Sequence, residues 1–263
     1  MEVLVNTYRE PLQDMMHTGH IAVVDYTGKL LYSCGDPERV CYARSSAKPM
    51  QAMCVLESGA VEKYGLDDQD IALFCASHNG EPMHIQAVRR ALGKAGLTES
   101  VLQCGVHYPE ADRMKAAGEQ PSQIHCNCSG KHSGMLVTAA AMGEDLDTYY
   151  KPEHPVQQRI LHMIGEICEY DPQKIIMGTD GCGVPVHFLP LPMVWPAWLI
   201  RRAWEKRWEQ KRPALRRPWE NIPLSCRAPA GLTLSLWKNT IVSSANREPM
   251  AITLWEIKRK ASA

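Results

Sequence analysis

A serine and a lysine three residues apart are the first candidates for chemistry in this chain. Ser45 and Lys48 occur in RSSAKPMQ, where either serine can cap a helix and Pro49 fits its first turn. At a helix start this spacing puts both side chains on one face, within hydrogen-bond reach. Serine needs a base to act as a nucleophile, and a lysine deprotonated by burial and a cationic neighbour, Arg44, can be that base. The alternative is a capping serine beside a solvated lysine.

A second candidate is the cysteine-rich segment CNCSGKH, residues 126–132, at an expected loop-to-helix junction. The helix N-terminus and Lys131 favour the thiolate form of its cysteines. The segment can serve as a metal ligand set or as a clamp for an oxyanion and substrate, and the alternative is a pair of buried, inert thiols. Because Cys-x-Cys is not the usual zinc spacing, this segment alone does not predict a structural zinc site.

Two further candidates are turns that follow expected strands. The segment GTDGCG, residues 178–183, follows the strand expected over 174–180 and carries Asp180 and Cys182. Ser77 and His78 follow the apolar run 71–76, which reads as a buried strand. Catalytic groups often occupy such loops, although either segment can be only a turn.

The elements that must position these residues are of mixed type. Residues 20–34 predict a hairpin that turns at 25–28. Helices are predicted from Ser45 or Ser46 to Gly59 and over three further ranges with helical spacing of apolar residues. These ranges are 83–95, 131–142 and 154–168. Because strands and helices do not alternate strictly, we expect a fold of the α/β class in the broad sense, either α+β or a mixed layered fold.

Composition excludes several classes of protein. The chain has 263 residues, of which 45% are hydrophobic and 22% charged, which excludes a disordered, collagen-like or coiled-coil protein. The net charge is +0, so no overall field attracts nucleic acid or a membrane surface. The longest apolar stretch, 184–200, is too short and too rich in proline to span a membrane. Residues 1–10 contain no secretory signal, so we expect a cytoplasmic protein whose cysteines are thiols.

The charge is distributed unevenly along the chain. Residues 1–193 hold 15 Lys and Arg against 24 Asp and Glu, whereas residues 194–263 hold 14 against 5 and all 7 tryptophans. Basic doublets recur every five residues from 201 to 217, a period that matches neither a helix nor a strand face. We therefore expect a domain over 1–193 and a basic, Trp-rich tail over 194–263 that is aberrant or poorly ordered. Nucleic-acid binding by this tail is the less favoured alternative.

Read in order, these segments resemble the Rhizobium etli-type L-asparaginase family, also called the asparaginase II family. The resemblance covers about residues 3–193 and lies in five motifs. These motifs are Arg44-Ser45-Ser46-Ala47-Lys48-Pro49, Ala76-Ser77-His78, His107-Tyr108-Pro109, Asn127-Cys128-Ser129-Gly130-Lys131-His132 and Asp180-Gly181-Cys182-Gly183-Val184-Pro185.

The resemblance implies a fold similar to serine β-lactamases and glutaminases, with a central antiparallel sheet surrounded by helices, and a homodimer. It implies hydrolysis of L-asparagine to L-aspartate and ammonia. Ser45 would be the nucleophile, Lys48 its base and Ser77 a second active-site serine. A zinc ion, not essential for activity, would be held by Cys128, Lys131 and Cys182. Lys131 must be neutral to bind a metal, which requires a site that lowers its pKa. We assign substrate binding to Arg44, His78, Asn127, His132 and Asp180.

Two departures from the family pattern keep alternatives open. Cys126 stands where the family usually has His or Asn, so the thiol cluster gains a member. Nothing in 194–263 matches the family's C-terminal third, whose K-x-G-A-E-G lysine is expected to pair with the second serine. The catalytic domain is therefore expected to be incomplete at its C-terminus. The alternatives are an inactive relic, a zinc- or thiol-binding protein without activity, a Ser–Lys glutaminase, and an asparaginase with Cys128 as nucleophile.

Overall fold

Helices and short antiparallel strands make up the described part of the chain, which confirms the α+β class. The computed structural model describes residues 2–25, 29–106, 120–194 and 250–254. Its strands are β1 (Glu2–Arg9), β2 (Leu12–Gly19), β3 (Ile21–Asp25), β4 (Leu30–Cys34), β5 (Val40–Tyr42), β6 (Ile176–Thr179), β7 (Pro185–Pro190) and β8 (Met250–Leu254). Its α-helices are α1 (Lys48–Glu57), α2 (Ala60–Tyr64), α3 (Asp68–Cys75), α4 (Pro82–Lys94), α6 (Ser129–Met142), α7 (Pro155–Ile167) and α8 (Leu191–Val194).

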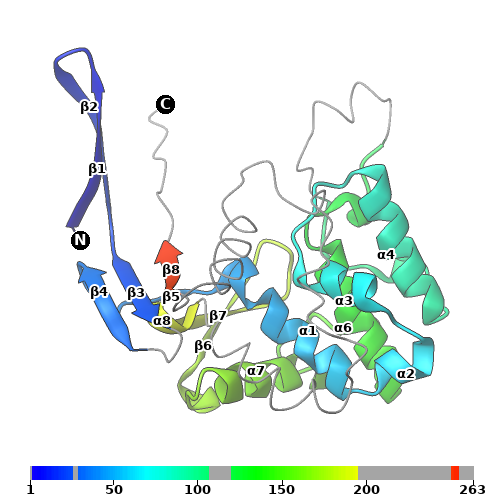
Figure 1. Cartoon of the computed structure of the whole chain (residues 1–263). Coiled ribbons are helices and arrows are strands. Elements are labelled where there is room, and N and C mark those ends of the chain that lie inside the picture. Colours follow the sequence, from blue (N-terminus) through cyan, green and yellow to red (C-terminus); the bar gives the residue numbers. More distant parts are fainter. Residues whose placement is uncertain (1, 26–28, 107–119, 195–249, 255–263) are drawn as a thin grey trace.

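The strands fall into three small antiparallel sheets. Their orders are β1-β2, β4-β3-β8 and β5-β7-β6. Figure 1 shows the β1–β2 hairpin extending away from the helices, which gather on the opposite side of the molecule. Among the described residues, the single central sheet implied by the family resemblance is not seen.

Several expected elements are confirmed. The hairpin predicted over 20–34 is the pair β3 and β4, with Ile21 opposite Cys34. Helices α4, α6 and α7 fall on the three ranges with helical spacing, and β6 lies within the strand expected over 174–180. The centre of the predicted turn at 26–28 lies outside the described residues, as does most of the expected tail. Five residues of that tail form β8, which pairs with β3.

The start of α1 differs in one detail from the expected capped helix. Residues Arg44–Ala47 form a 3₁₀ turn, and α1 follows it with Ala47 rather than a serine as N-cap. The Ser46 hydroxyl donates instead to the carbonyl of Ala43. Pro49 lies in the first turn of α1, where a missing backbone N–H costs no hydrogen bond. The serines therefore precede the helix in a tight turn.

The prediction of a buried strand over 71–76 is wrong, because this run belongs to α3. The Asp67 side chain accepts hydrogen bonds from the backbone N–H groups of Gln69 and Asp70, and Asp70 reciprocates in a capping box. Asp70 is buried and ion-paired to Arg90 and Lys94 of α4. A short helix packed on most sides has no polar face, so hydrophobic periodicity does not distinguish it from a buried strand.

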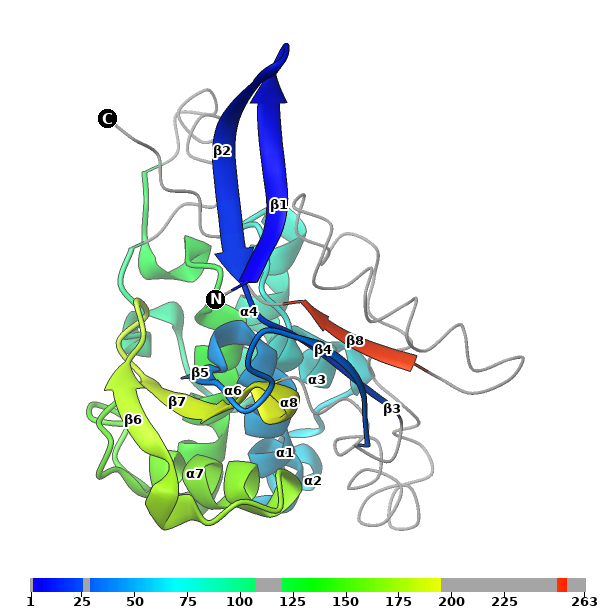
Figure 2. The same ribbon diagram turned by 90° about the vertical axis from the view of Figure 1, so that its left-hand side faces the viewer.

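Helix α6 lies against α3 at very close range. A Cβ at Gly130 would come within 2.7 Å of the Leu73 carbonyl oxygen, so only glycine permits this approach. The approach places the first turn of α6, with Cys128 and Lys131, beside the loop that follows α3. Figure 2 shows the β5-β7-β6 sheet beside this helical group.

Sheet β5-β7-β6 carries the remaining candidate residues at its ends. The turn between β6 and β7 is closed by hydrogen bonds from the N–H of Asp180 to the Val184 carbonyl and from the N–H of Gly183 to Asp180. At the end of β5, the Ala43 N–H donates to the carbonyl of His187 on β7. The sheet thus brings the segment that enters α1 close to the 180–183 turn.

His187 on β7 predicts how stability depends on pH. Its ring is 1% exposed, and neither nitrogen has a hydrogen-bond partner in the described part of the chain. Burial lowers its pKa to about 4 from 6.5. Because the unfolded chain binds this proton more readily, stability is full above pH 6.5 and falls as the pH drops toward 4. In urea unfolding, His187→Phe should remove a slope of about 1.4 kcal/mol per pH unit across this window, and an unchanged slope would contradict this account.

No helix in the described part of the chain is both long and apolar enough to cross a membrane. The nine cysteines of the described segments are free thiols, as expected.

Candidate active site

The three residues expected to carry catalysis lie in one hydrogen-bonded chain. Lys48 Nζ donates to Ser77 Oγ at 2.6 Å, and Ser77 Oγ donates to Ser45 Oγ at 3.3 Å. Lys48 also donates to the backbone carbonyls of Ala76 at 3.1 Å and Asn127 at 3.4 Å. The expected direct contact between Lys48 and Ser45 is therefore replaced by one that passes through Ser77. Sequence reasoning missed this because the contact joins the start of α1 to the end of α3.

Lys48 is a buried amine whose environment favours the neutral form. Lys48 is 1% exposed, and burial lowers the pKa of its amine below the usual 10.5. Lys131 lowers this pKa further, whereas Cys128 raises it. The cation that assists is therefore Lys131 rather than Arg44, which forms an ion pair with Asp180 instead. A lysine with a depressed pKa can act as a general base.

Arg44 adopts a backbone conformation that is unusual for its type. Its φ angle is 46°, in the left-handed region, immediately before Ser45. Its exposed guanidinium lies 3.3 Å from Asp180 Oδ1 across the gap to the 180–183 turn. Strained residues of this kind cluster at functional sites, where surrounding contacts hold them in place.

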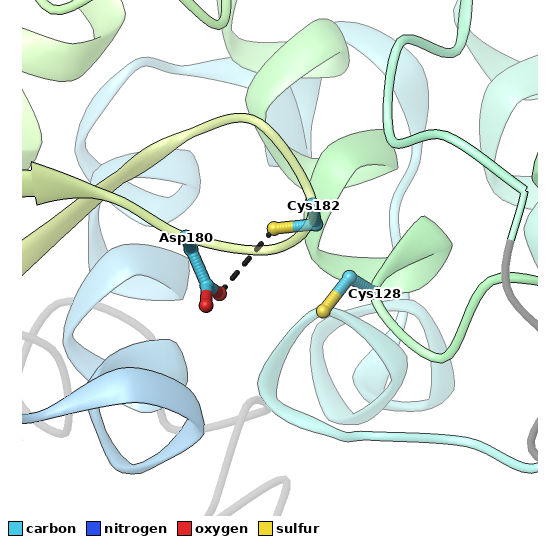
Figure 3. A group of neighbouring side chains, drawn as sticks. All are labelled: Cys128, Asp180 and Cys182. Atoms are coloured by element: carbon cyan, nitrogen blue, oxygen red, sulfur yellow. Dashed lines mark hydrogen bonds between the residues drawn. The ribbon is translucent and has the colours of Figure 1, made fainter.

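Beside the serines lies a cluster of thiols with one carboxylate. Figure 3 shows Cys128 at the start of α6 facing Asp180 and Cys182 of the 180–183 turn. The ligand atoms of these three residues all lie within 4.8 Å of one another. Cys182 Sγ donates to Asp180 Oδ2 at 3.4 Å, and Lys131 Nζ donates to Cys182 Sγ at 3.1 Å.

The charges in this cluster divide between Cys128 and Lys131. The neighbouring thiols of Cys126 and Cys182, together with the charges of Lys48 and Lys131, lower the pKa of Cys128. Burial opposes the charged form of Lys131, yet Cys128, Cys182 and Asp180 raise its pKa overall. The expectation that the site lowers the pKa of Lys131 is therefore wrong; the anionic partners around it stabilise the ammonium. The ligands available to a metal ion here would therefore be the two thiols and the carboxylate, because Lys131 is charged.

The remaining predicted residues are mostly engaged within the protein. His78 is buried, with Nδ1 accepting from the Gly80 N–H and Nε2 bonded to Ser129 Oγ. Asn127 contributes its backbone carbonyl, which accepts from Lys48.

His132 on α6 is fully buried and bonds to Tyr149. Its Nδ1 lies 2.6 Å from the Tyr149 hydroxyl, which accepts from the Gln103 N–H. Its Nε2 has no partner among the described residues, and burial lowers its pKa to about 3. Tyr149 and Gln103 carry no sequence signal that connects them to the site.

Comparison with known proteins identifies the family. A sequence model of the L-asparaginase II family matches residues 5–217. The chain belongs to the L-asparaginase II family. No curated protein matches the chain.

Membership of the L-asparaginase II family supports an asparaginase-type hydrolase. The match includes all five motifs quoted above and continues past Met193. Of these motifs, His107-Tyr108-Pro109 lies outside the described residues. The boundary at Met193 stays a prediction.

Proposed function

We propose that this asparaginase-family chain hydrolyses the side-chain amide of L-asparagine to L-aspartate and ammonia by a Ser–Ser–Lys relay. The observation that carries the proposal is the hydrogen-bonded chain from Lys48 through Ser77 to Ser45. Family membership supports the reaction class, and the lowered pKa of Lys48 supports its role as the base.

In the first step, Ser45 Oγ attacks the amide carbon. With Lys48 neutral, both hydroxyls can rotate so that Ser45 donates to Ser77 and Ser77 donates to the Lys48 lone pair. The proton of Ser45 then passes to Ser77 as the proton of Ser77 passes to Lys48. Lys48 returns a proton to the leaving nitrogen, ammonia departs, and water cleaves the aspartyl ester by the same path. Backbone N–H groups at the start of α1 are our candidates for stabilising the oxyanion.

The ion pair between Arg44 and Asp180 provides anchors for an amino-acid substrate. We propose that Arg44 receives the α-carboxylate and Asp180 the α-ammonium group. Half-buried Asn127 would line the site, whereas His132 is fully buried and would support the site from within the protein. A zwitterion can replace this ion pair because each partner exchanges one opposite charge for another, and the Arg44 side chain is exposed. The resemblance to serine β-lactamases, the homodimer and the cytoplasmic location also stay proposals.

Ser77→Ala distinguishes a relay from a direct Ser45–Lys48 contact. If protons pass through Ser77, its removal should lower kcat by about 10²–10⁴-fold, the usual contribution of a proton-transfer group. Ser77→Thr keeps the hydroxyl and should retain most activity. A kcat for Ser77→Ala within threefold of the unaltered chain would show that Lys48 reaches Ser45 without it.

We propose that the cluster of Cys128, Cys182 and Asp180 holds a zinc ion that is not essential for turnover. Two thiols and a carboxylate form a ligand set that zinc accepts. Asp180 would then turn Oδ2, which accepts from Cys182, toward the ion and keep Oδ1, which faces Arg44, for the substrate. Lys131 would then contribute charge rather than a ligand.

Replacing one thiol tests this ligand set. Cys182→Ser should weaken zinc binding by about 100-fold or more in calorimetric titration, because a hydroxyl is a far poorer zinc ligand than a thiolate. Cys168→Ser, which alters a buried thiol beside Met50, serves as the control and should leave the affinity unchanged. Equal affinities for the two variants would place the metal elsewhere.

Ammonia release tests the proposed function directly. The purified chain is assayed with L-asparagine and with L-glutamine, each with and without a chelator. Turnover of asparagine that survives chelation supports the proposal, and preference for glutamine would reassign the substrate. Zinc binding without turnover would favour the alternative of a non-catalytic thiol and zinc protein.

A further inference from the structure

We infer that His78 is a positioning residue that holds Ser77 between Lys48 and Ser45. It does so by tying the loop after α3 to the first turn of α6 through Ser129. The inference rests on the proposed function, since it assigns a purpose to the placement of Ser77. It also gives His78 a role other than contact with substrate.

The hydrogen bonds around His78 fix which of its nitrogens carries the proton. The Gly80 N–H donates to Nδ1 at 3.1 Å, so Nδ1 carries no hydrogen in the neutral ring. Nε2–H therefore donates to Ser129 Oγ at 2.8 Å, and Ser129 Oγ donates onward to the Ile124 carbonyl at 2.8 Å. Burial keeps the ring neutral by lowering its pKa to about 3. From the Gly80 N–H through His78 and Ser129 to the Ile124 carbonyl, each hydrogen bond therefore has one fixed donor and one fixed acceptor.

Gly80, at one end of this chain of hydrogen bonds, occupies a position that favours glycine. Its φ angle is +69°, and a Cβ there would meet the His125 carbonyl oxygen at 3.0 Å. The left-handed backbone aims its N–H at the imidazole, which a bulkier residue would do only with strain. The loop from Ser77 to Gly80 is therefore pressed against the segment that leads into α6.

A second tether joins the same two segments next to Ser77. The backbone N–H of His78 donates to the Asn127 carbonyl at 3.3 Å, and that carbonyl also accepts from Lys48 Nζ at 3.4 Å. Lys48 thus contacts both segments that His78 ties together. A shift of the loop away from α6 would move Ser77 relative to Lys48, because the lysine is held on both sides.

The geometry also argues against direct contact between His78 and substrate. The residue is 1% exposed, and both ring nitrogens are already used within the protein. A substrate could bond to the imidazole only after one of these hydrogen bonds broke.

Two substitutions at position 78 separate the two hydrogen bonds. In His78→Asn the amide oxygen can replace Nδ1 and keep the bond to Gly80, but the side chain is too short to reach Ser129. In His78→Gln the amide N–H can reach Ser129 and restore the tether. Ser129→Ala removes the tether from the other side, and the pair His78→Asn/Ser129→Ala completes a double-mutant cycle.

A second histidine offers a matched control for the loss of a buried imidazole. His154, the N-cap of α7, is also buried, with Nδ1 accepting from the Val156 N–H and Nε2 bonded to the Asp145 carbonyl. His154→Asn should therefore lower the melting temperature about as much as His78→Asn while leaving the active site in place.

The measurements are kcat and KM for asparagine and the rate at which a fluorophosphonate labels Ser45. We expect His78→Asn and Ser129→Ala each to lower kcat and the labelling rate by about 10–100-fold, because a shift of Ser77 by about 1 Å has a cost of this size. KM should change less than about twofold. The double variant should be no worse than either single variant, and His78→Gln should recover most of both rates. A rise in KM at constant kcat would make His78 a substrate contact. Equal losses in His78→Asn and His154→Asn would make its role merely structural.

The labelling rate keeps this inference separate from the proposed reaction. If the unaltered chain labels at Ser45 but does not hydrolyse asparagine, the proposed function fails while the labelling rates still decide the role of His78. If the unaltered chain neither labels nor hydrolyses, Ser45 is not activated and both proposals fall.

Discussion

Ser45→Ala should abolish asparagine hydrolysis, with kcat/KM lower by about 10⁴-fold or more, as for other enzymes that lose their nucleophile. The expected loss is this large because the hydrogen-bonded chain from Lys48 through Ser77 ends at the Ser45 hydroxyl, so the substitution leaves the relay without its nucleophile. The measurement is ammonia release by the purified variant, with its melting temperature showing that it remains folded. Ser45 is half-buried and its loss removes only one hydroxyl, so folding should be preserved.

The adjacent serine provides the control for this experiment. The Ser46 hydroxyl donates to the Ala43 carbonyl within the 3₁₀ turn and takes no part in the relay. Ser46→Ala should therefore change stability slightly and kcat by less than tenfold, in keeping with the loss of one local hydrogen bond. Full activity in Ser45→Ala would instead point to the Cys128 thiolate as the nucleophile.

Lys48→Met should have an effect of similar size, lowering kcat by about 10³-fold or more because it removes the terminal proton acceptor. Methionine fills much of the same buried volume without a charge, so the protein should remain folded. The fluorophosphonate reaction of Ser45 should fall in parallel, since the same base activates the serine for both reagents.

Lys48→Arg distinguishes the base from a mere positive charge. Arginine keeps the charge but cannot give up its proton in a protein. We expect it to be as inactive as Lys48→Met in the steady-state assay. Substantial activity in Lys48→Arg would show that the site needs a cation at this position and not a proton acceptor.

The sequence was most informative where structure is local. The hairpin of β3 and β4 and the helices α4, α6 and α7 follow from side-chain periodicity and turn residues within each segment. The run that became α3 was misassigned because it is apolar on every side, although its capping residue Asp67 carried the correct signal. Local patterns therefore predicted where most elements lie and failed where tertiary packing removed the polar face.

The site depends on contacts that no local pattern contains. Spacing placed Ser45 and Lys48 near each other, but it did not show Ser77 between them, because Ser77 arrives from the end of α3. Similarly, Arg44 was expected to depress the pKa of Lys48, whereas the structure pairs it with Asp180 from the distant β6–β7 turn. The pKa values of Lys48 and Lys131 shift in opposite directions because burial dominates at Lys48, whereas the anionic partners of Lys131 outweigh its burial.

The most direct test of the account is to find which side chain becomes acylated during turnover. The purified chain is mixed with L-asparagine, quenched in acid within the first turnovers and digested for mass spectrometry. We predict an aspartyl ester on the peptide that contains Ser45, absent from Ser45→Ala and accumulating less in Lys48→Met. An aspartyl thioester on Cys128, or steady release of ammonia with no acylated residue in any quench, would contradict the Ser–Ser–Lys relay.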